Sequence, residues 1–365
     1  MKNDDPKEKS GRSLWAKLRS GTGVDRGEGG KEAGPSAATP PPAPTAGAGA
    51  KPARQAPQPK ERWATSDLGA FVEKLESLGG HMHPNAAATH DMFELVHETK
   101  VDTTLDPFSD EYVAQQIALY EEISGRSLDQ ESGEMTHIDP GPRVDANNPY
   151  GTKNVGFIAQ HARAVLTTLM IANLPNGARI LDLGAGWGLS SEAAAFTGAK
   201  VTAVDINPNF TELVNRRAAR LKNGIKAVRS NFDAFDTSDR FDLILFYECL
   251  HHAVKPWETI ANAARFLAPG GRIAFAGEPV NEVWWPHWGL RIGGRETYVI
   301  HKHGWFESGW SEKFIGDCFR RAGLEFVAVR RAGLRGGVVG IGTRPGEAAD
   351  RPIIVPPGAV RVPAA

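Results

Sequence analysis

Three glycines at alternate positions, Gly184, Gly186 and Gly188, follow a short apolar run that contains the acid Asp182. Small residues typical of a helix come next. This order predicts a strand, a tight loop and a helix, in which glycine lets the backbone approach a ligand closely. A second apolar run ends in Asp205, and an acid at the end of the second strand can accept hydrogen bonds from both hydroxyls of a ribose. The pattern therefore predicts a site for a cofactor that carries a nucleoside.

The glycine spacing argues against a dinucleotide. Such a site requires G-x-G-x-x-G, because a pyrophosphate has to lie at the helix N-terminus. Leu189 stands at the position of the third glycine, and Asp182 is a poor neighbour for a pyrophosphate. A cationic ligand, such as an ammonium group beside a sulfonium, would suit Asp182 better. Two alternatives stay open: a nicotinamide-dependent oxidoreductase, and a glycine turn that serves packing alone.

These features resemble the class I S-adenosylmethionine (SAM)-dependent methyltransferases, whose first motif is an acidic strand end followed by G-x-G-x-G. Three further segments resemble later motifs of the family: 231–233, 241–252 and 267–273. The resemblance covers residues 154 to 343, roughly half of the chain. It implies an α/β fold with a doubly wound, Rossmann-like, seven-stranded and mostly parallel sheet, and it implies SAM as the cofactor. An antiparallel seventh strand is expected at the edge, joined to the sixth by the glycine-rich turn 332–337.

The resemblance also assigns roles in holding SAM. It places the methionyl end at Asp182 and the backbone of Gly184–Gly188, the ribose at Asp205 and the adenine at Asn231–Asp233. The full set of predicted cofactor-binding residues is Asp182, Gly184, Gly186, Gly188, Asp205, Ile206, Asn231, Phe232, Asp233 and Glu248.

The loop after the fourth strand points to the acceptor. It reads Tyr-Glu-Cys-Leu-His-His over 247–252 and lacks the Asn/Asp-Pro-Pro-Tyr/Phe run of many nitrogen-methylating relatives. An oxygen or small-molecule acceptor is favoured by elimination. A hydroxyl needs a base, and histidine titrates in the right range. His251 and His252 are therefore the first predicted catalytic residues and Glu278 is the third, although a histidine that only caps the loop is a competing interpretation. Cys249 is interpreted as a buried apolar residue rather than a nucleophile.

A long insertion, 279–309, follows the fifth strand. It and its border are rich in tryptophan, namely Trp284, Trp285, Trp288, Trp305 and Trp310. Such rings could form a lid that stacks on a saccharide, or a satellite core under a long loop. His301 and His303 with His287 were weighed as ligands of a divalent metal, but magnesium prefers carboxylates, so no metal site is predicted.

The chain divides by composition into four parts. Residues 1–60 read as a disordered Pro/Gly-rich tail, with a short amphipathic stretch over 13–19 that is a candidate for binding a protein partner. Residues 61–150 read as a helical cap, 151–345 as the methyltransferase domain and 346–365 as a loose C-terminal tail. Segments 106–112 and 120–126 of the cap resemble stretches that precede methyltransferase domains in bacterial surface-glycan biosynthesis.

Composition narrows the setting. The chain has 365 residues and a net charge of -1, so nothing indicates a nucleic-acid partner. It has two cysteines, no apolar run judged long enough to span a membrane and no secretory leader, which favours the cytoplasm. The predicted function is SAM-dependent methyl transfer to an oxygen of a saccharide or another polyhydroxylated metabolite, in cell-surface glycan biosynthesis. The alternatives are methylation of a lipid or quinone-like ring, and a SAM-binding regulatory protein without turnover.

Overall fold

The computed structural model describes residues 60–129, 133–135, 137–281, 285–331, 333–347 and 350–363. The chain divides into two units, 1–56 and 57–365, and every described residue belongs to the second. The predicted tail, with its amphipathic stretch at 13–19, therefore lies outside the described residues, apart from Lys60.

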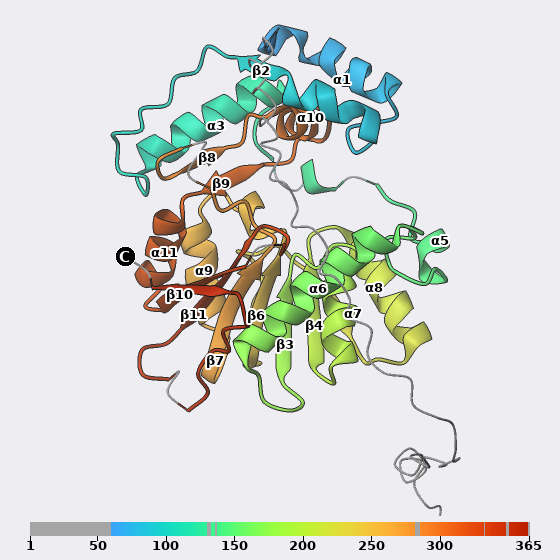
Figure 1. The fold of residues 1–365 in the computed structure, drawn as a ribbon, viewed down its shortest axis with the longest axis vertical. Helices are drawn as coiled ribbons and strands as arrows, with labels where there is room; N and C mark the ends of the chain where they lie inside the picture. The colour runs from blue at the N-terminus through green and yellow to red at the C-terminus, as the bar shows by residue number, and fades with distance from the viewer. Residues whose placement is uncertain are drawn as a thin grey trace, which may run out of the picture. The chain divides into compact units, whose positions relative to one another are not determined.

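The centre of the fold is one mixed sheet. Its strands are β3 (Arg179–Leu183), β4 (Lys200–Asp205), β5 (Lys226–Arg229), β6 (Phe241–Tyr247), β7 (Leu267–Ala276), β10 (Glu325–Arg330), β11 (Val338–Thr343) and β12 (Val360–Pro363). They lie in the order β12-β10-β11-β7-β6-β3-β4-β5 (Figure 1). The five strands from β5 to β7 pair in parallel. The predicted doubly wound, mostly parallel α/β sheet is confirmed.

Two details of the sheet differ from the prediction. The antiparallel strand β11 lies between β7 and β10 rather than at the edge. An eighth strand, β12, comes from the segment predicted to be a loose tail and pairs antiparallel with β10. Alternating apolar residues, Val360 and Val362, let this proline-rich segment add to an edge that would otherwise leave its backbone groups unpaired. The sheet therefore has eight strands, not seven.

Helices cover both faces of the sheet. Successive residues of one strand enter different cores: Ile244 and Phe246 join the first, and Leu243 and Leu245 the second. The second core receives helices α6 (Val155–Ala172), α7 (Leu189–Phe196) and α8 (Pro208–Leu221). The first receives α9 (Pro256–Ala264) and α11 (Glu312–Arg321). This alternation is the packing that a sheet buried on both sides requires.

Helix α6 has 18 residues and a mean hydropathy of 1.3, so by length and composition it could cross a membrane. The sequence analysis found no run of that kind and was wrong by this criterion. In the structure, α6 packs on α7 and β7. His161 and Thr168 are buried on this helix, as expected for a helix packed against a sheet.

The cap contains helices α1 (Leu68–Ser77), α2 (Ala87–Asp91) and α3 (Asp110–Ser124), and also a parallel strand pair, β1 (Glu61–Ala64) with β2 (Phe93–Val96). Helix α3 is capped at both ends: the Ser109 hydroxyl accepts from the Tyr112 amide, and Gly125 ends the helix at φ 69°. The expectation of an all-helical cap was wrong, because β1 and β2 pair across it.

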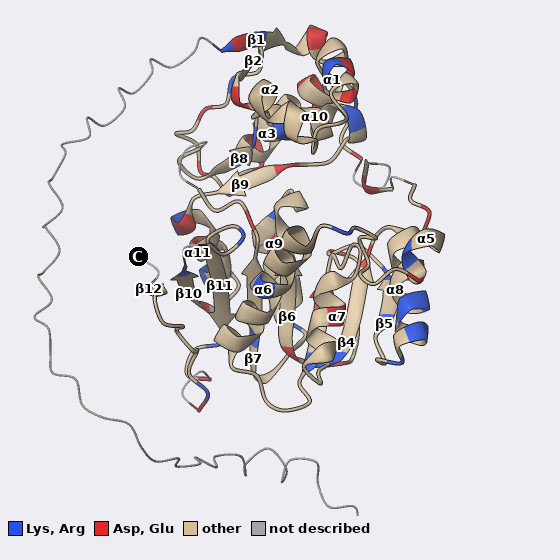
Figure 2. Ribbon diagram, turned by 45° about the vertical axis from the view of Figure 1, so that its right-hand side comes forward, with Lys and Arg blue, Asp and Glu red and all other residues tan. Residues whose placement is uncertain are grey.

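The insertion after β7 packs with the cap. It forms β8 (Trp288–Leu290), α10 (Gly294–His303) and β9 (Ser308–Trp310), and α10 packs on α1 and α3 (Figure 2). The Tyr112 hydroxyl donates to the Trp288 carbonyl at 2.6 Å, and the Leu290 amide donates to Gln116 Oε1 at 3.0 Å. Segments 176 and 174 residues apart in the chain are thus joined by buried hydrogen bonds.

Candidate functional site

A cavity of about 390 Å³ opens at the carboxyl ends of β3, β4 and β6. Its volume falls in the range of roughly 300–1,000 Å³ that small-molecule sites occupy. Nine of the predicted site residues line it, namely Gly184, Gly186, Asp205, Ile206, Asn231, Phe232, Asp233, Glu248 and His252. Four others do not: Asp182, Gly188, His251 and Glu278.

The glycine loop brings its backbone to the cavity. Gly184 and Gly186 have φ of 68° and 51°, in the left-handed region that glycine adopts readily. A Cβ on Gly186 would meet nothing within 4 Å, whereas one on Gly184 would lie 2.6 Å from Cys249 Cβ. Gly186 therefore borders open space, and Gly184 allows the close approach of the loop after β6.

Asp205 faces the cavity from the end of β4. Its Oδ2 accepts from the Gly186 amide and its Oδ1 from the Asn207 amide, both at 2.8 Å. Burial raises the pKa of this carboxyl to about 6, against the effect of these two amides. Each oxygen has a further lone pair, so a ligand with two neighbouring hydroxyls matches this carboxylate.

Asp182 does not reach the cavity. It is buried, and its Oδ2 accepts from the hydroxyls of Ser190 and Ser191 at 2.7 and 2.5 Å. Those serines stand in the first turn of α7, so Asp182 fixes the helix start rather than meeting a ligand directly. Burial raises its pKa to about 6. The prediction that Asp182 contacts the cofactor is not matched by its position: it lies outside the cavity lining, with Oδ2 bonded to the two serines and Oδ1 buried without a hydrogen-bond partner among the described residues.

The other two predicted binding segments also face the cavity. Asn231 shapes its turn by accepting the amides of Asp233 and Ala234, and Phe232 packs on Phe246. Glu248 has a left-handed φ of 55° and pairs with Arg335. It also lies 3.5 Å from His161 Nδ1.

Glu278, at the end of β7, organises the loop after β6. Its Oε1 accepts the amides of Cys249 and Leu250 at 2.8 and 3.0 Å. Its Oε2 accepts the His251 amide at 3.2 Å and lies 2.7 Å from His251 Nδ1. One buried carboxylate thus holds three backbone donors of the short helix η4 (Leu250–His252). Glu278 is a positioning residue and does not line the cavity, contrary to its predicted catalytic role.

The two histidines have different surroundings. His251 is buried between two carboxylates, with Nε2 3.5 Å from Glu307 Oε2, and burial followed by the charge of His252 lowers its pKa. His252 lines the cavity. Burial alone would lower the pKa of His252, but Glu134 and Glu307 outweigh that effect and raise it. His252 Nδ1 lies 3.1 Å from the Phe306 carbonyl and 3.4 Å from Glu134 Oε1.

Further cavity residues were not singled out from the sequence and come from segments far apart in the chain: Glu134, Tyr150, Trp187, Phe210 and Tyr247. Trp305, one of the tryptophans expected to stack on an acceptor, also lines the cavity. Burial raises the pKa of the Glu134 carboxyl. Trp187, between two loop glycines, packs on Phe210. The Arg143 guanidinium lies over the Trp187 ring, with its Cζ 4.4 Å from the ring centre. The aromatic Trp187 inside the glycine loop is the one sequence feature that could have indicated this wall of the cavity.

The tryptophans of the insertion form a core more than a lid. Trp288 and Trp310 are fully buried, and Trp288 packs on Trp257 and Phe314. Trp305 is the described tryptophan of this group that lines the cavity, and Trp284 lies outside the described residues. Of the two alternatives for this segment, the satellite core fits most of it. His287, His301 and His303 do not form a metal-binding group among the described residues.

Glu278→Gln should destabilise the fold by about 2–4 kcal/mol, because an amide group cannot accept from every donor that the carboxylate satisfies and leaves buried donors unpaired. Urea unfolding followed by tryptophan fluorescence measures this change. Glu258→Gln, at an exposed position of α9, is the matched control and should change stability by less than about 0.5 kcal/mol. Unchanged stability of Glu278→Gln together with lost methyl transfer would instead give Glu278 a direct role in catalysis.

Comparisons with known proteins agree with this geometry. Residues 181–275 match the protein family described as Methyltransferase domain. A stretch of 97 residues is 38% identical to demethylmenaquinone methyltransferase of Tropheryma whipplei, covering 27% of this chain and 40% of that protein. Another of 103 residues is 38% identical to ubiquinone biosynthesis O-methyltransferase of Xanthomonas axonopodis pv. citri, covering 27% and 42%. The chain thus spans about two fifths of the length of these curated relatives.

Among solved structures, the Burkholderia thailandensis 1,6-didemethyltoxoflavin-N1-methyltransferase is similar with a TM-score of 0.41 and 22% identity, over 52% of this chain and 81% of that one. This similarity is too low to support an argument about function. The domain match falls on strands β3 to β7, the part of the sheet that carries the glycine loop and Asp205. Residues 181–275 therefore match a methyltransferase domain, and the cofactor of such a domain is S-adenosyl-L-methionine.

Proposed function

We propose that this protein transfers a methyl group from SAM to a hydroxyl oxygen of a saccharide or another polyhydroxylated metabolite. The observation that carries the proposal is one cavity with two chemically different walls. Asp205 and the glycine loop form the wall suited to a nucleoside, while His252, Glu134 and Trp305 form the other. The reaction needs this arrangement, because donor and acceptor have to meet within one enclosed space.

The residues of the first wall fit SAM. Asp205 would accept the ribose hydroxyls, the backbone of Gly184–Gly186 would lie along the methionyl end, and Phe232 would pack on the adenine. Bound SAM supplies an electrophilic methyl group next to a positive sulfur. The chain's own contribution is to hold that group toward the loop after β6 and to keep water away with Trp187 and Tyr150.

The second wall meets the acceptor oxygen. Of the three predicted catalytic residues, His252 is the one that lines the cavity, so we assign it to the acceptor. A carbonyl oxygen only accepts hydrogen bonds, so the contact with Phe306 places the hydrogen on Nδ1 and the lone pair on Nε2. Glu134 is the second ionisable group on this wall, and its raised pKa suits a group that takes a proton near neutral pH.

A sugar fits the second wall because its C–H face can stack on the Trp305 indole while its hydroxyls bond to Glu134 and His252. The names of the curated relatives favour a second candidate, a quinone-like ring. The family match ends at residue 275, before the insertion that provides Trp305, and it does not include Glu134. The acceptor wall therefore supports the saccharide independently of those relatives. Since both cysteines, Cys249 and Cys318, are unpaired and buried, we also propose a reducing, cytoplasmic setting.

The proposed function is tested by incubating the full chain with methyl-labelled SAM and parallel panels of saccharides and of hydroxylated quinone precursors. Transfer of label to a saccharide, at an oxygen identified by mass spectrometry, is the expected result. Label in the quinone panel alone would replace the proposed acceptor by the second candidate. Tight SAM binding without label in any panel, at a concentration that saturates the site, would favour the regulatory protein without turnover.

Asp205→Asn should weaken binding of S-adenosylhomocysteine by about 10–100-fold, since a hydrogen bond to a charged group contributes about 1.5–3 kcal/mol. The carboxyl, with its pKa near 6, loses its charge as the pH falls below that value. Wild-type affinity should therefore fall by up to about tenfold per pH unit below pH 6 and stay level above it. The variant should show no such dependence. The charge of His252 also lowers this pKa, although less than the two amides do.

Isothermal titration calorimetry between pH 5 and 7.5 measures both effects. Asp236→Asn, an exposed acid near the end of the loop after β5, serves as the control and should keep wild-type affinity. Wild-type affinity in Asp205→Asn at pH 7.5 would contradict the placement of the ribose.

His252→Gln should lower turnover by about 10²–10⁴-fold, the usual contribution of a group that assists proton transfer. Its affinity for S-adenosylhomocysteine should stay within about threefold of wild type, because His252 belongs to the acceptor wall. The exposed His137→Gln is the matched histidine control. Full activity of His252→Gln under saturating acceptor would remove this residue from the mechanism.

A further inference from the structure

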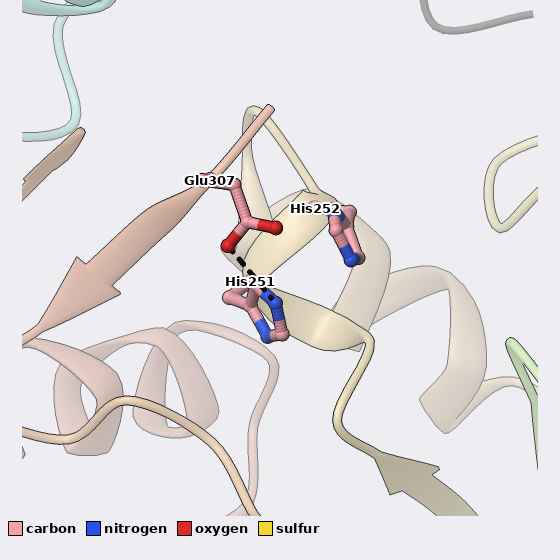
Figure 3. Close-up of side chains that lie close together, drawn as sticks. All are labelled: His251, His252 and Glu307. Atoms are coloured by element: carbon pink, nitrogen blue, oxygen red, sulfur yellow. Dashed lines mark ion pairs between the residues drawn. The ribbon is translucent and has the colours of Figure 1, made fainter. Parts of the chain in front are cut away.

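We propose that His251, His252 and Glu307 form a binding site for one divalent transition-metal ion, with zinc as the best fit, beside the cavity. One ligand atom from each of the three side chains lies within 4.8 Å of the others (Figure 3). His251 and His252 come from η4, and Glu307 comes from the insertion, immediately before β9. The site therefore joins the two parts of the chain that meet above the sheet.

The spacing suits a metal. His251 Nε2 and Glu307 Oε2 are 3.5 Å apart, close to the ~3.3 Å between neighbouring ligands of a four-coordinate zinc with bonds of about 2.0–2.1 Å. The second oxygen of the Glu307 carboxylate lies on the side of His252 (Figure 3). All three ligand atoms lie within 4.8 Å of one another, so modest side-chain rotations would bring them to ligand distance.

The outer contacts orient both rings as metal-binding histidines are oriented. His251 Nδ1 lies 2.7 Å from the Glu278 carboxylate, and His252 Nδ1 lies 3.1 Å from the Phe306 carbonyl. Because both partners are acceptors, each Nδ1 carries the hydrogen and each Nε2 carries the lone pair. A carboxylate or carbonyl on the far nitrogen is the usual second contact of a ligating histidine. The Glu307 carboxylate also has an outer contact, because it forms an ion pair with the Arg291 guanidinium.

The balance of charge favours a cation. Three carboxylates, those of Glu134, Glu278 and Glu307, surround the two imidazoles at largely buried positions. The positive charge of Arg291 partly offsets these carboxylates, but its guanidinium also forms an ion pair with Glu296 at 2.8 Å. Buried negative charge is costly unless it is compensated, so a divalent ion would stabilise this arrangement. Two imidazoles and one carboxylate suit zinc and similar ions, whereas magnesium and calcium prefer oxygen ligands.

The location gives the ion a role. Three protein ligands leave a coordination position open, as in catalytic zinc sites. Since His252 lines the cavity, that position would receive the acceptor oxygen, and the ion would make its hydroxyl proton easier to transfer to the Glu134 carboxylate, which lines the same wall. His252 would then act on the acceptor through the ion. This role rests on the proposed function, whereas the binding of the ion does not.

The test uses the full chain without a histidine tag, freed of metal by a chelator and then titrated with Co²⁺. Visible absorption reports the coordination of cobalt, and elemental mass spectrometry reports its stoichiometry. Wild-type protein should bind about one equivalent per chain, and Glu307→Gln and His251→Gln should bind at least ~10-fold more weakly. Glu296→Gln is the matched control, because it removes the other carboxylate of Arg291 and leaves the three ligands in place; it should bind cobalt as wild type does.

Two results would overturn the site: less than about a tenth of an equivalent bound by wild-type protein, or wild-type affinity in both ligand variants. Far-UV circular dichroism and S-adenosylhomocysteine binding check that each variant is folded. If one ligand variant fails to fold, a rise in the wild-type melting temperature with Zn²⁺ that persists in Glu296→Gln and is absent in the other ligand variant supports the site. Cobalt binding without methyl transfer to any acceptor would leave the site intact and remove the proposed function. Methyl transfer that survives complete metal removal would remove the ion's role alone.

Discussion

The buried carboxylate of Glu278 is the constraint on which the site depends. It comes from the end of β7, yet its hydrogen bonds all go to the loop after the neighbouring β6: three backbone amides and the ring of His251. Amide donors of a single helical turn point in one direction, so they can converge on one anion, as they do at any helix N-terminus. Once this contact forms, His252 has to face the cavity and the His251 carbonyl has to face the insertion, where Ser308 Oγ donates to it at 2.7 Å.

A second buried ion, the Arg217 guanidinium on α8, fixes the opposite side of the cavity. It bonds to Glu192 of α7 and to the carbonyls of Arg143, Val144 and Ala146. The segment so held leads into Tyr150 and puts the Arg143 side chain over Trp187. Both sides of the cavity are therefore fixed by a charge that satisfies backbone groups. Such contacts cannot slide, because displacement would leave several buried polar groups unpaired at once. The cofactor wall is thus largely preformed.

Local sequence predicted the parts of the fold that depend on local physics. The predicted order of strand, glycine loop and helix is found in β3, the loop 184–188 and α7, because an apolar run followed by alternate glycines leaves little choice. Asp205 was located for a similar reason, since the end of a parallel strand next to a glycine loop has one possible position. Asp182 was misjudged because nothing local shows that Ser190 and Ser191 turn back onto it. Glu134 and Glu307 could not be found, because the contact of Glu134 with His252 and that of Glu307 with His251 depend on how the cap and the insertion pack.

The difference between local and long-range structure also separates the region of the family match from the acceptor wall. The match covers strands β3 to β7, with the glycine loop and Asp205 that the proposed function assigns to SAM, and these residues lie close to the strand ends. The acceptor wall combines Glu134 of the segment 61–150, His252 of η4 and Trp305 of the insertion. The cap and the insertion share one core, in which Tyr112, Trp288 and Phe314 pack together. Because that core is continuous with the sheet through Phe275 and Trp310, a change of acceptor would require repacking rather than a change of loop. On the proposed function, acceptor specificity would therefore depend on the packing between cap and sheet, and the variants that test it have to preserve that core.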